Sequence, residues 1–155
     1  MSKPNRLKTL QLMIALHEAA HVVALRVFAG VGSRVTLQEW DGETAYAFTE
    51  SIGSVSRANH ITSLVAALVI TDEIHKMLPG LLQPRTDWAE IRKLTGLGPE
   101  ELRVTPTWKT VSAWMEGARK GIGAVAKEIV AGRTVFEFGE EFSLVRIGDN
   151  VEVEV

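Results

Sequence analysis

Residues 12–25 read LMIALHEAAHVVAL, and this stretch decides how the chain folds. Apolar side chains surround three titratable residues, His17, Glu18 and His21, and no glycine or proline interrupts the run. The expected conformation is therefore an α-helix. A helix this apolar belongs in a protein core, where an unpaired polar side chain costs roughly 1–3 kcal/mol. The three polar side chains therefore need partners inside the fold.

The spacing of these residues, His-Glu-x-x-His, is typical of a helical zinc site. Residues four apart lie one above the other on a helix, so His17 and His21 can each present a ring nitrogen to one ion. In a zinc hydrolase a third side chain completes the protein ligands, and water takes the fourth position. Glu18 would accept a proton from that water. The alternative is an ordinary helix whose histidines are incidental.

The composition is that of a globular protein, with 155 residues, 46% of them hydrophobic and 23% charged. We expect one domain over residues 1–155 with its own core. The net charge of −2 and the pI of 6.1 argue against a nucleic-acid-binding surface. There is no cysteine, which excludes disulfides and thiolate ligands. Histidine, aspartate and glutamate remain as zinc ligands.

No membrane segment is expected from the sequence. Basic residues precede the first apolar run, as in a signal peptide, but the histidines and Glu18 interrupt its hydrophobic region. The second apolar run, Ile61–Ile70, is about half as long as a membrane-spanning helix. We therefore expect a soluble, cytoplasmic protein.

The rest of the pattern predicts an α+β fold that is mostly helical, with a small β-sheet. Helices are predicted by apolar periodicity and by their flanking residues over 7–29, from Ser56 or Asn59 to Leu78, 88–94 and 108–129. Strands are predicted over 34–40 and 43–49, joined by a two-residue turn at Asp41-Gly42, and over 134–138, 142–147 and 151–155.

The helix predicted over 108–129 carries a narrow apolar stripe, which has two interpretations. The stripe could pair with another chain, giving a homo-oligomer or a complex with a partner protein. Packing against the motif helix is preferred, because Gly117, Gly121 and Gly123 would weaken an isolated coiled coil.

The third zinc ligand has more than one candidate. Asp87 could ligate the metal or could cap the helix that follows it, and spacing does not choose between these roles. Glu73 is an alternative ligand or a supporting residue. For the group that stabilises the oxyanion, the candidates are Tyr46, His60 and His75.

The order of the elements resembles the peptidase domain of the FtsH family, the ATP-dependent membrane zinc proteases of bacteria and organelles. The resemblance covers roughly residues 12–131. Ala15–Ala24 looks like the family's zinc helix, Arg34–Leu37 like its following strand and Leu64–Glu73 like its second helix. Thr86–Ile91 is similar to the segment in which an aspartate, the third ligand, precedes a helix. The resemblance implies that Asp87 is the third ligand.

The chain differs from that family in two respects. Ala20 stands where the family usually has glycine, and Thr86 stands where it has asparagine. No phosphate-binding motif G-x-x-x-x-G-K-[ST] occurs, so we expect a stand-alone peptidase without the ATPase module, and a β extension over residues 133–155.

These observations predict a zincin-like, zinc-dependent metallopeptidase. One Zn²⁺ ion would be held by His17, His21 and Asp87, and Glu18 would act as general base on a zinc-activated water. The substrate would be a peptide or an unfolded protein lying along the hairpin of residues 34–49. The alternative is an inactive regulatory or interaction module that keeps the metal site.

Overall fold

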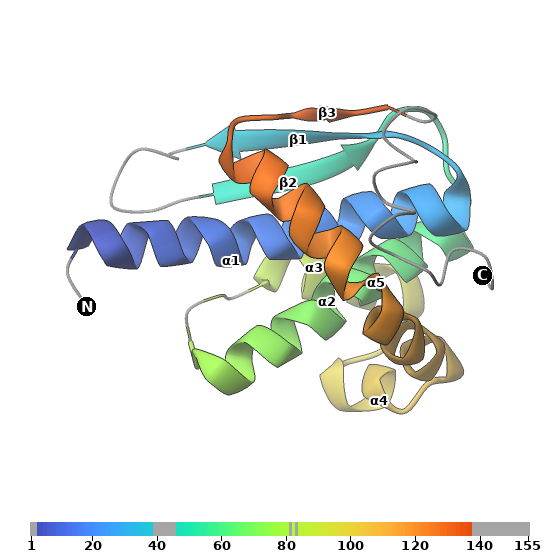
Figure 1. Ribbon diagram of the computed structural model, residues 1–155. Coiled ribbons are helices and arrows are strands. Elements are labelled where there is room, and N and C mark those ends of the chain that lie inside the picture. Colours follow the sequence, from blue (N-terminus) through green and yellow to red (C-terminus); the bar gives the residue numbers. More distant parts are fainter. Residues whose placement is uncertain (1–2, 39–45, 81, 83, 138–155) are drawn as a thin grey trace.

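The computed structural model describes residues 3–38, 46–80, 82 and 84–137, and they form an α+β fold as predicted (Figure 1). In chain order the described elements are α1 (Lys3–Ala24), the π-helical turn η1 (Leu25–Ala29), β1 (Ser33–Gln38), β2 (Tyr46–Ser51), α2 (Arg57–Met77), α3 (Arg85–Thr95), α4 (Pro99–Arg103), α5 (Pro106–Val130) and β3 (Val135–Phe136). The strands predicted over 142–147 and 151–155 lie outside the described residues.

The three strands form one antiparallel sheet in the order β2-β1-β3. The predicted hairpin is therefore confirmed, although its two-residue turn at Asp41-Gly42 lies outside the described residues. The register of the strands differs from the predicted one. Gln38 pairs with Tyr46, whereas an uninterrupted two-residue turn would place Gln38 opposite Ala45.

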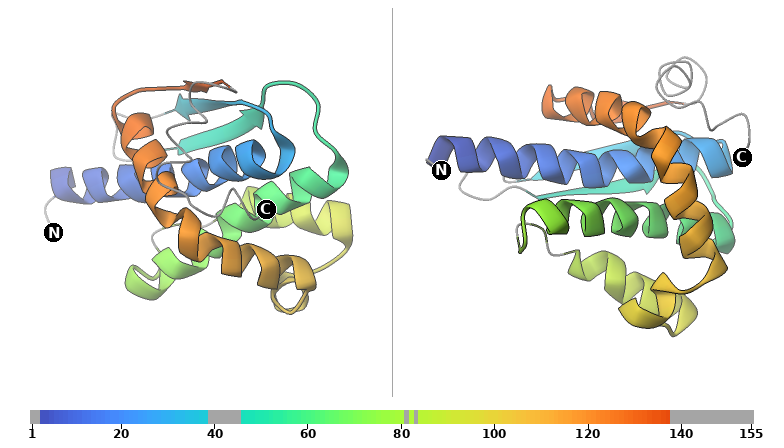
Figure 2. Two further views of the ribbon diagram at one scale, coloured as in Figure 1. Left: turned by 45° about the vertical axis from the view of Figure 1, so that its right-hand side comes forward. Right: turned by 60° about the horizontal axis from the view of Figure 1, so that its bottom comes forward.

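The helices form a layer against one face of this sheet. In Figure 1, α1 lies along the sheet, and α2 and α5 pack against α1. The right-hand view of Figure 2 shows α2 beside α1, with α3 on the far side of α2. This arrangement brings one end of α3 close to the middle of α1, although their sequences are far apart.

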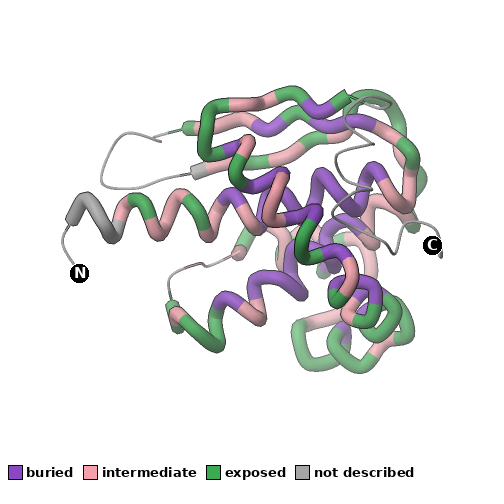
Figure 3. The backbone as a smooth tube through the Cα atoms, viewed as in Figure 1, coloured by how far each residue is buried: buried purple, intermediate pink, exposed green. Residues whose placement is uncertain are grey.

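The core lies where α1, α2 and α5 meet, and this region is purple in Figure 3. The apolar stripe of α5 faces this core, as preferred from the sequence. Its buried residues are Trp108, Val111, Met115, Ala118, Ile122, Val125 and Ile129. From α1, the small residues Ala15, Ala19 and Ala20 are fully buried. Small side chains let neighbouring helices approach closely beside the histidines.

Local capping explains where the helices begin and end. The hydroxyl of Ser56, rather than Asn59, caps α2 by accepting a hydrogen bond from the Asn59 backbone N–H at 3.1 Å. Gly30 follows η1 in the left-handed conformation, with φ of 67°, which glycine adopts without strain. α3 begins at Arg85, three residues before the predicted start, with Pro84 at the capping position.

Among the described residues, Leu7–Ala29 is long and apolar enough by length and composition to cross a membrane. Of its most apolar window, 61% is buried within the protein. A core helix and a membrane helix both satisfy this criterion, so the cytoplasmic location stays a prediction.

Arg103, the last residue of α4, contacts side chains of three other helices, α2, α3 and α5. The guanidinium of Arg103 donates two hydrogen bonds of 2.8 Å to the carboxylate of Asp72 on α2. Its central carbon also lies 5.2 Å from the ring centre of Trp88 on α3 and 5.7 Å from that of Trp108 on α5. Trp88 directly follows Asp87, so this cluster holds α3 against α2.

Replacing Arg103 with alanine is expected to lower the free energy of unfolding by about 0.5–2 kcal/mol. This value combines a cation–π contribution of about 0.5–1 kcal/mol with a partly solvent-screened ion pair worth up to about 1 kcal/mol. Urea denaturation of the variant measures the loss. Arg92→Ala, at an exposed position of α3, is the control. Equal midpoints for the two variants would contradict the stabilising role of Arg103.

Candidate metal centre

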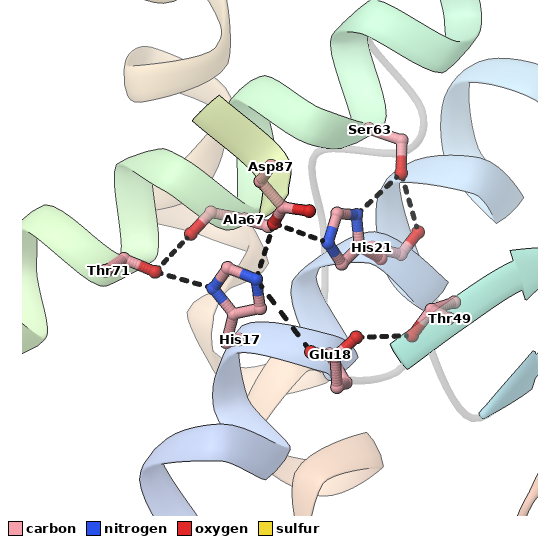
Figure 4. A network of polar contacts seen from close by, with 8 residues as sticks. All are labelled: His17, Glu18, His21, Thr49, Ser63, Ala67, Thr71 and Asp87. Carbon is pink, nitrogen blue, oxygen red and sulfur yellow. Dashed lines mark hydrogen bonds and ion pairs between the residues drawn. The ribbon is translucent and has the colours of Figure 1, made fainter. Parts of the chain in front are cut away.

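Two histidines from α1 and an aspartate from α3 converge on one point (Figure 4). The Oδ2 atom of Asp87 lies 2.6 Å from Nε2 of His17 and 3.1 Å from Nε2 of His21. One potential ligand atom from each residue lies within 4.8 Å of the others. His17, His21 and Asp87 therefore form a group that could hold a metal ion.

The positions of these residues follow from the helices that carry them. His17 and His21 are four residues apart in the regular part of α1, so their rings project from the same face. Asp87 lies in the first turn of α3, and its carboxylate turns toward the two imidazoles (Figure 4). The interpretation of Asp87 as a helix cap is wrong, because Pro84 occupies the capping position.

The outer nitrogen of each ring contacts a hydroxyl group on α2. Nδ1 of His17 lies 2.6 Å from Oγ1 of Thr71, and Nδ1 of His21 lies 3.1 Å from Oγ of Ser63. Both hydroxyl-bearing residues are buried. Histidine ligands of metals commonly use their second nitrogen in this way, which fixes the orientation of the ring.

The chemistry of the three inner atoms fits a divalent cation. When Nδ1 carries the ring proton, Nε2 presents a lone pair, and a carboxylate oxygen also presents lone pairs. Such atoms repel one another at 2.6–3.1 Å unless positive charge lies between them. At these distances the positive charge is a shared proton, which a bound ion would replace with the ligand atoms further apart. Ligand atoms around tetrahedral zinc are separated by about 3.3 Å, given bonds of about 2.0–2.1 Å.

No protein-family model, curated protein or solved structure matches this chain. The assignment of the centre therefore depends on the geometry and chemistry of its own residues.

Glu18 is buried next to the centre and is the candidate base. One oxygen of its carboxylate accepts a hydrogen bond of 3.0 Å from the hydroxyl of Thr49 on β2, and the other lies 3.8 Å from Nε2 of His17. Burial raises the pKa of Glu18 to about 7, an effect that His17 partly opposes. A carboxylate with this proton affinity is well suited to accept and release a proton near neutral pH.

Asp87 has the opposite electrostatic character. Burial alone would raise its pKa, but attraction to His21 and hydrogen bonds with His17 and His21 outweigh that effect. The pKa of Asp87 is held well below its usual range, so the side chain is a carboxylate at neutral pH. The two acidic groups therefore differ: the Asp87 carboxyl is held ionised, and the Glu18 carboxyl binds a proton more readily.

The centre opens into a cleft of about 1110 Å³. Its walls come from α1, β2, α2 and α3, and all of the residues from Ala47 to Ser51 line it. Leu10 and Ile14 supply apolar surface from α1 and Leu25 from η1, whereas Arg57 and Glu90 supply charge. This volume is comparable with the roughly 300–1,000 Å³ of clefts that bind ligands.

The other residues singled out in the sequence are not all near the centre. Glu73 pairs with Arg119 on α5, so the structure does not place it as a ligand or supporting residue. His75 accepts a hydrogen bond from the backbone N–H of Gly80 and is exposed. His60 lines the cleft, with its Nε2 atom 3.7 Å from the carboxylate of Glu90. The side chain of Tyr46 lies outside the described part of the chain.

Three supporting residues, Thr49, Ser63 and Thr71, could not be identified from the sequence. A weak indication was present, since Ser63 and Thr71 bound the uninterrupted apolar stretch Leu64–Ile70. Buried hydroxyl groups at the two ends of such a stretch need hydrogen-bond partners. Ser63 and Thr71 are eight residues apart, so they lie on the same side of α2, the side that faces the two histidines.

Proposed function

We propose that this protein is a zinc-dependent metallopeptidase in which His17, His21 and Asp87 hold one Zn²⁺ ion and Glu18 is the general base. The observation that carries the proposal is the position of Glu18. Its carboxylate lies 3.8 Å from a ligand nitrogen of His17, in the same cleft as the three ligand atoms. A purely structural metal site has no need of a buried proton acceptor open to a cleft.

Two residues of the chain, Glu18 and Thr49, would act in the reaction beside the metal ligands. A bound zinc ion supplies Lewis acidity, which favours loss of a proton from water and polarises a carbonyl group. Glu18 accepts the proton of the attacking water and then delivers it to the leaving amine. The hydroxyl of Thr49 holds one oxygen of Glu18, which leaves the other oxygen directed toward the ligand group.

The substrate proposed for the cleft is an extended peptide, from a short polypeptide or an unfolded protein. β2 is an edge strand of the sheet, paired only with β1 among the described strands. Unpaired backbone groups of an edge strand can hydrogen-bond to an extended chain. Thr49 faces Glu18, and β2 runs along the cleft, so a peptide on this edge would pass beside the ligand group.

The proposed activity agrees with a relationship to the peptidase domain of FtsH-type proteases. In support, a histidine-bearing helix, a strand, a second helix and an aspartate at the start of a third helix follow one another in the order of that resemblance. We propose in addition that the protein acts in the cytoplasm, alone, as a homo-oligomer or with a separate partner protein that delivers unfolded substrates.

Removing and restoring the metal tests this function. Protein stripped with a chelator is expected to lose cleavage of casein, and one equivalent of Zn²⁺ per chain is expected to restore it. Gel electrophoresis of the casein products and metal analysis of the protein measure the two quantities. Refolding after stripping is checked by circular dichroism.

The outcomes separate the proposed enzyme from the alternative module. Cleavage that tracks one equivalent of zinc supports the peptidase. One equivalent of bound zinc with no cleavage of casein or of a library of unstructured peptides would favour an inactive module with a metal site. Failure to bind any divalent ion would exclude both.

A further inference from the structure

The hydroxyl of Thr71 lies within hydrogen-bond distance of two groups, a backbone carbonyl and the ring of His17. Its Oγ1 atom is 2.7 Å from the backbone carbonyl oxygen of Ala67, one turn earlier in α2, and 2.6 Å from Nδ1 of His17 (Figure 4). Both distances are those of strong hydrogen bonds. Each contact therefore requires a hydrogen atom between its two heavy atoms.

These two contacts determine whether Nδ1 of His17 carries a proton. Only Thr71 can supply the hydrogen shared with Ala67, because a carbonyl group has none. Thr71 has a single hydroxyl proton, so it must accept the second hydrogen bond. Nδ1 of His17 is then the donor. Nε2 is the nitrogen that faces Asp87, and the hydrogen in its 2.6 Å contact with Oδ2 of Asp87 is the one that a bound ion would replace.

Ser63 makes the corresponding two contacts with His21, but at longer distances. Its hydroxyl lies 3.1 Å from Nδ1 of His21 and 3.5 Å from the backbone carbonyl oxygen of the same residue. At 3.5 Å an oxygen–oxygen contact is at the limit of a hydrogen bond. The proton of Ser63 is therefore less strictly assigned than that of Thr71, and the orientation of His21 is less strongly fixed.

We propose that Thr71 and Ser63 are positioning residues that keep Nδ1 of His17 and His21 as a hydrogen-bond donor, which leaves Nε2 as the ligating nitrogen, and that Thr71 has the larger effect. This proposal rests on the proposed metal centre, because its consequence is that both Nε2 atoms face the ion before it binds. α2 thereby acts on the centre without touching the metal. Loss of such a partner commonly weakens metal binding by about 10–100-fold.

The matched variants are Thr71→Val, which keeps the shape but removes the hydroxyl, and Thr71→Ser, which restores it. We expect Thr71→Val to weaken Zn²⁺ binding about 10–100-fold, Thr71→Ser to recover most of that loss and Ser63→Ala to have a smaller effect. Competition with a chromophoric chelator measures the affinity. Thr62→Val, at a residue whose hydroxyl bonds only to the Ala58 carbonyl among its described contacts, is the control.

The proton on Nδ1 can be detected without metal. Nitrogen-15 NMR of the histidine rings is expected to show a proton on Nδ1 of His17, beside the one that Nε2 shares with Asp87, and loss of the Nδ1 proton in Thr71→Val. A ring of His17 with no proton on Nδ1 in the unaltered protein, or unchanged zinc affinity in folded Thr71→Val, would overturn the proposal. If the unaltered protein binds no zinc, the metal centre is refuted, while the NMR result still decides the role of the hydroxyls.

Discussion

Replacing Glu18 with glutamine is expected to lower kcat for peptide cleavage about 10²–10⁴-fold while one zinc ion stays bound. Glutamine has nearly the same shape, and its amide oxygen can still accept the hydrogen bond from Thr49. It cannot accept a proton from water, so the loss falls on the chemical step rather than on the affinity for substrate. Initial rates on a fluorogenic peptide measure kcat and KM separately.

The stability of this variant provides an internal check. The charged form of Glu18 is disfavoured by burial, so a neutral amide at this position is not expected to destabilise the fold. Loss of activity together with a lower melting temperature would therefore indicate a structural role. Glu116→Gln, on the exposed surface of α5, is the control and is expected to keep full activity. Cleavage by Glu18→Gln at the rate of the unaltered protein would exclude Glu18 as the base.

The helices were largely predictable because their determinants are local. Ser56 caps α2, and glycines 30 and 96 follow their helices in the left-handed conformation. In α5, the spacing of the apolar residues was sufficient to identify the buried face of the helix. α4 was missed, because it has five residues and too few positions to show a helical period.

The register of the hairpin was not predictable in the same way. A turn signal at Asp41-Gly42 predicts a pairing one residue away from the one observed. A shift of one residue exchanges the two faces of a strand relative to its neighbour. The observed register is the one in which Thr49 turns toward Glu18, so contact with α1 matters here as well as the local sequence.

The candidate centre was predictable only in part. His17, Glu18 and His21 stand out because their spacing is that of one helix face. Asp87 is 66 residues beyond His21, and no spacing rule connects residues on different helices. The sequence left Asp87 open between a metal ligand and a helix cap, and only the resemblance to a known family favoured the ligand. Thr71 was not predictable, since its contact with His17 depends on how α1 and α2 pack.

Replacing Asp87 with alanine is expected to weaken Zn²⁺ binding by more than the roughly 10–100-fold that loss of a supporting hydrogen bond costs. The change removes one of three ligands and also the negative charge that faces both histidines. Asp87→Asn keeps the shape and one weakly ligating oxygen, so its loss should be smaller. Titration against a chromophoric chelator measures both affinities, and casein cleavage should fall in parallel.

Glu73→Gln is the decisive comparison, because Glu73 was the competing candidate for the third ligand. Its carboxylate pairs with Arg119 on α5, so zinc affinity should not change when it is neutralised. Loss of binding in Glu73→Gln with full binding in Asp87→Ala would reverse the assignment. If instead Asp87→Ala alone loses the ion, the centre requires α1 and α3 together. Metal binding would then stabilise the packing of these helices, since the ion binds the folded arrangement and not the unfolded chain.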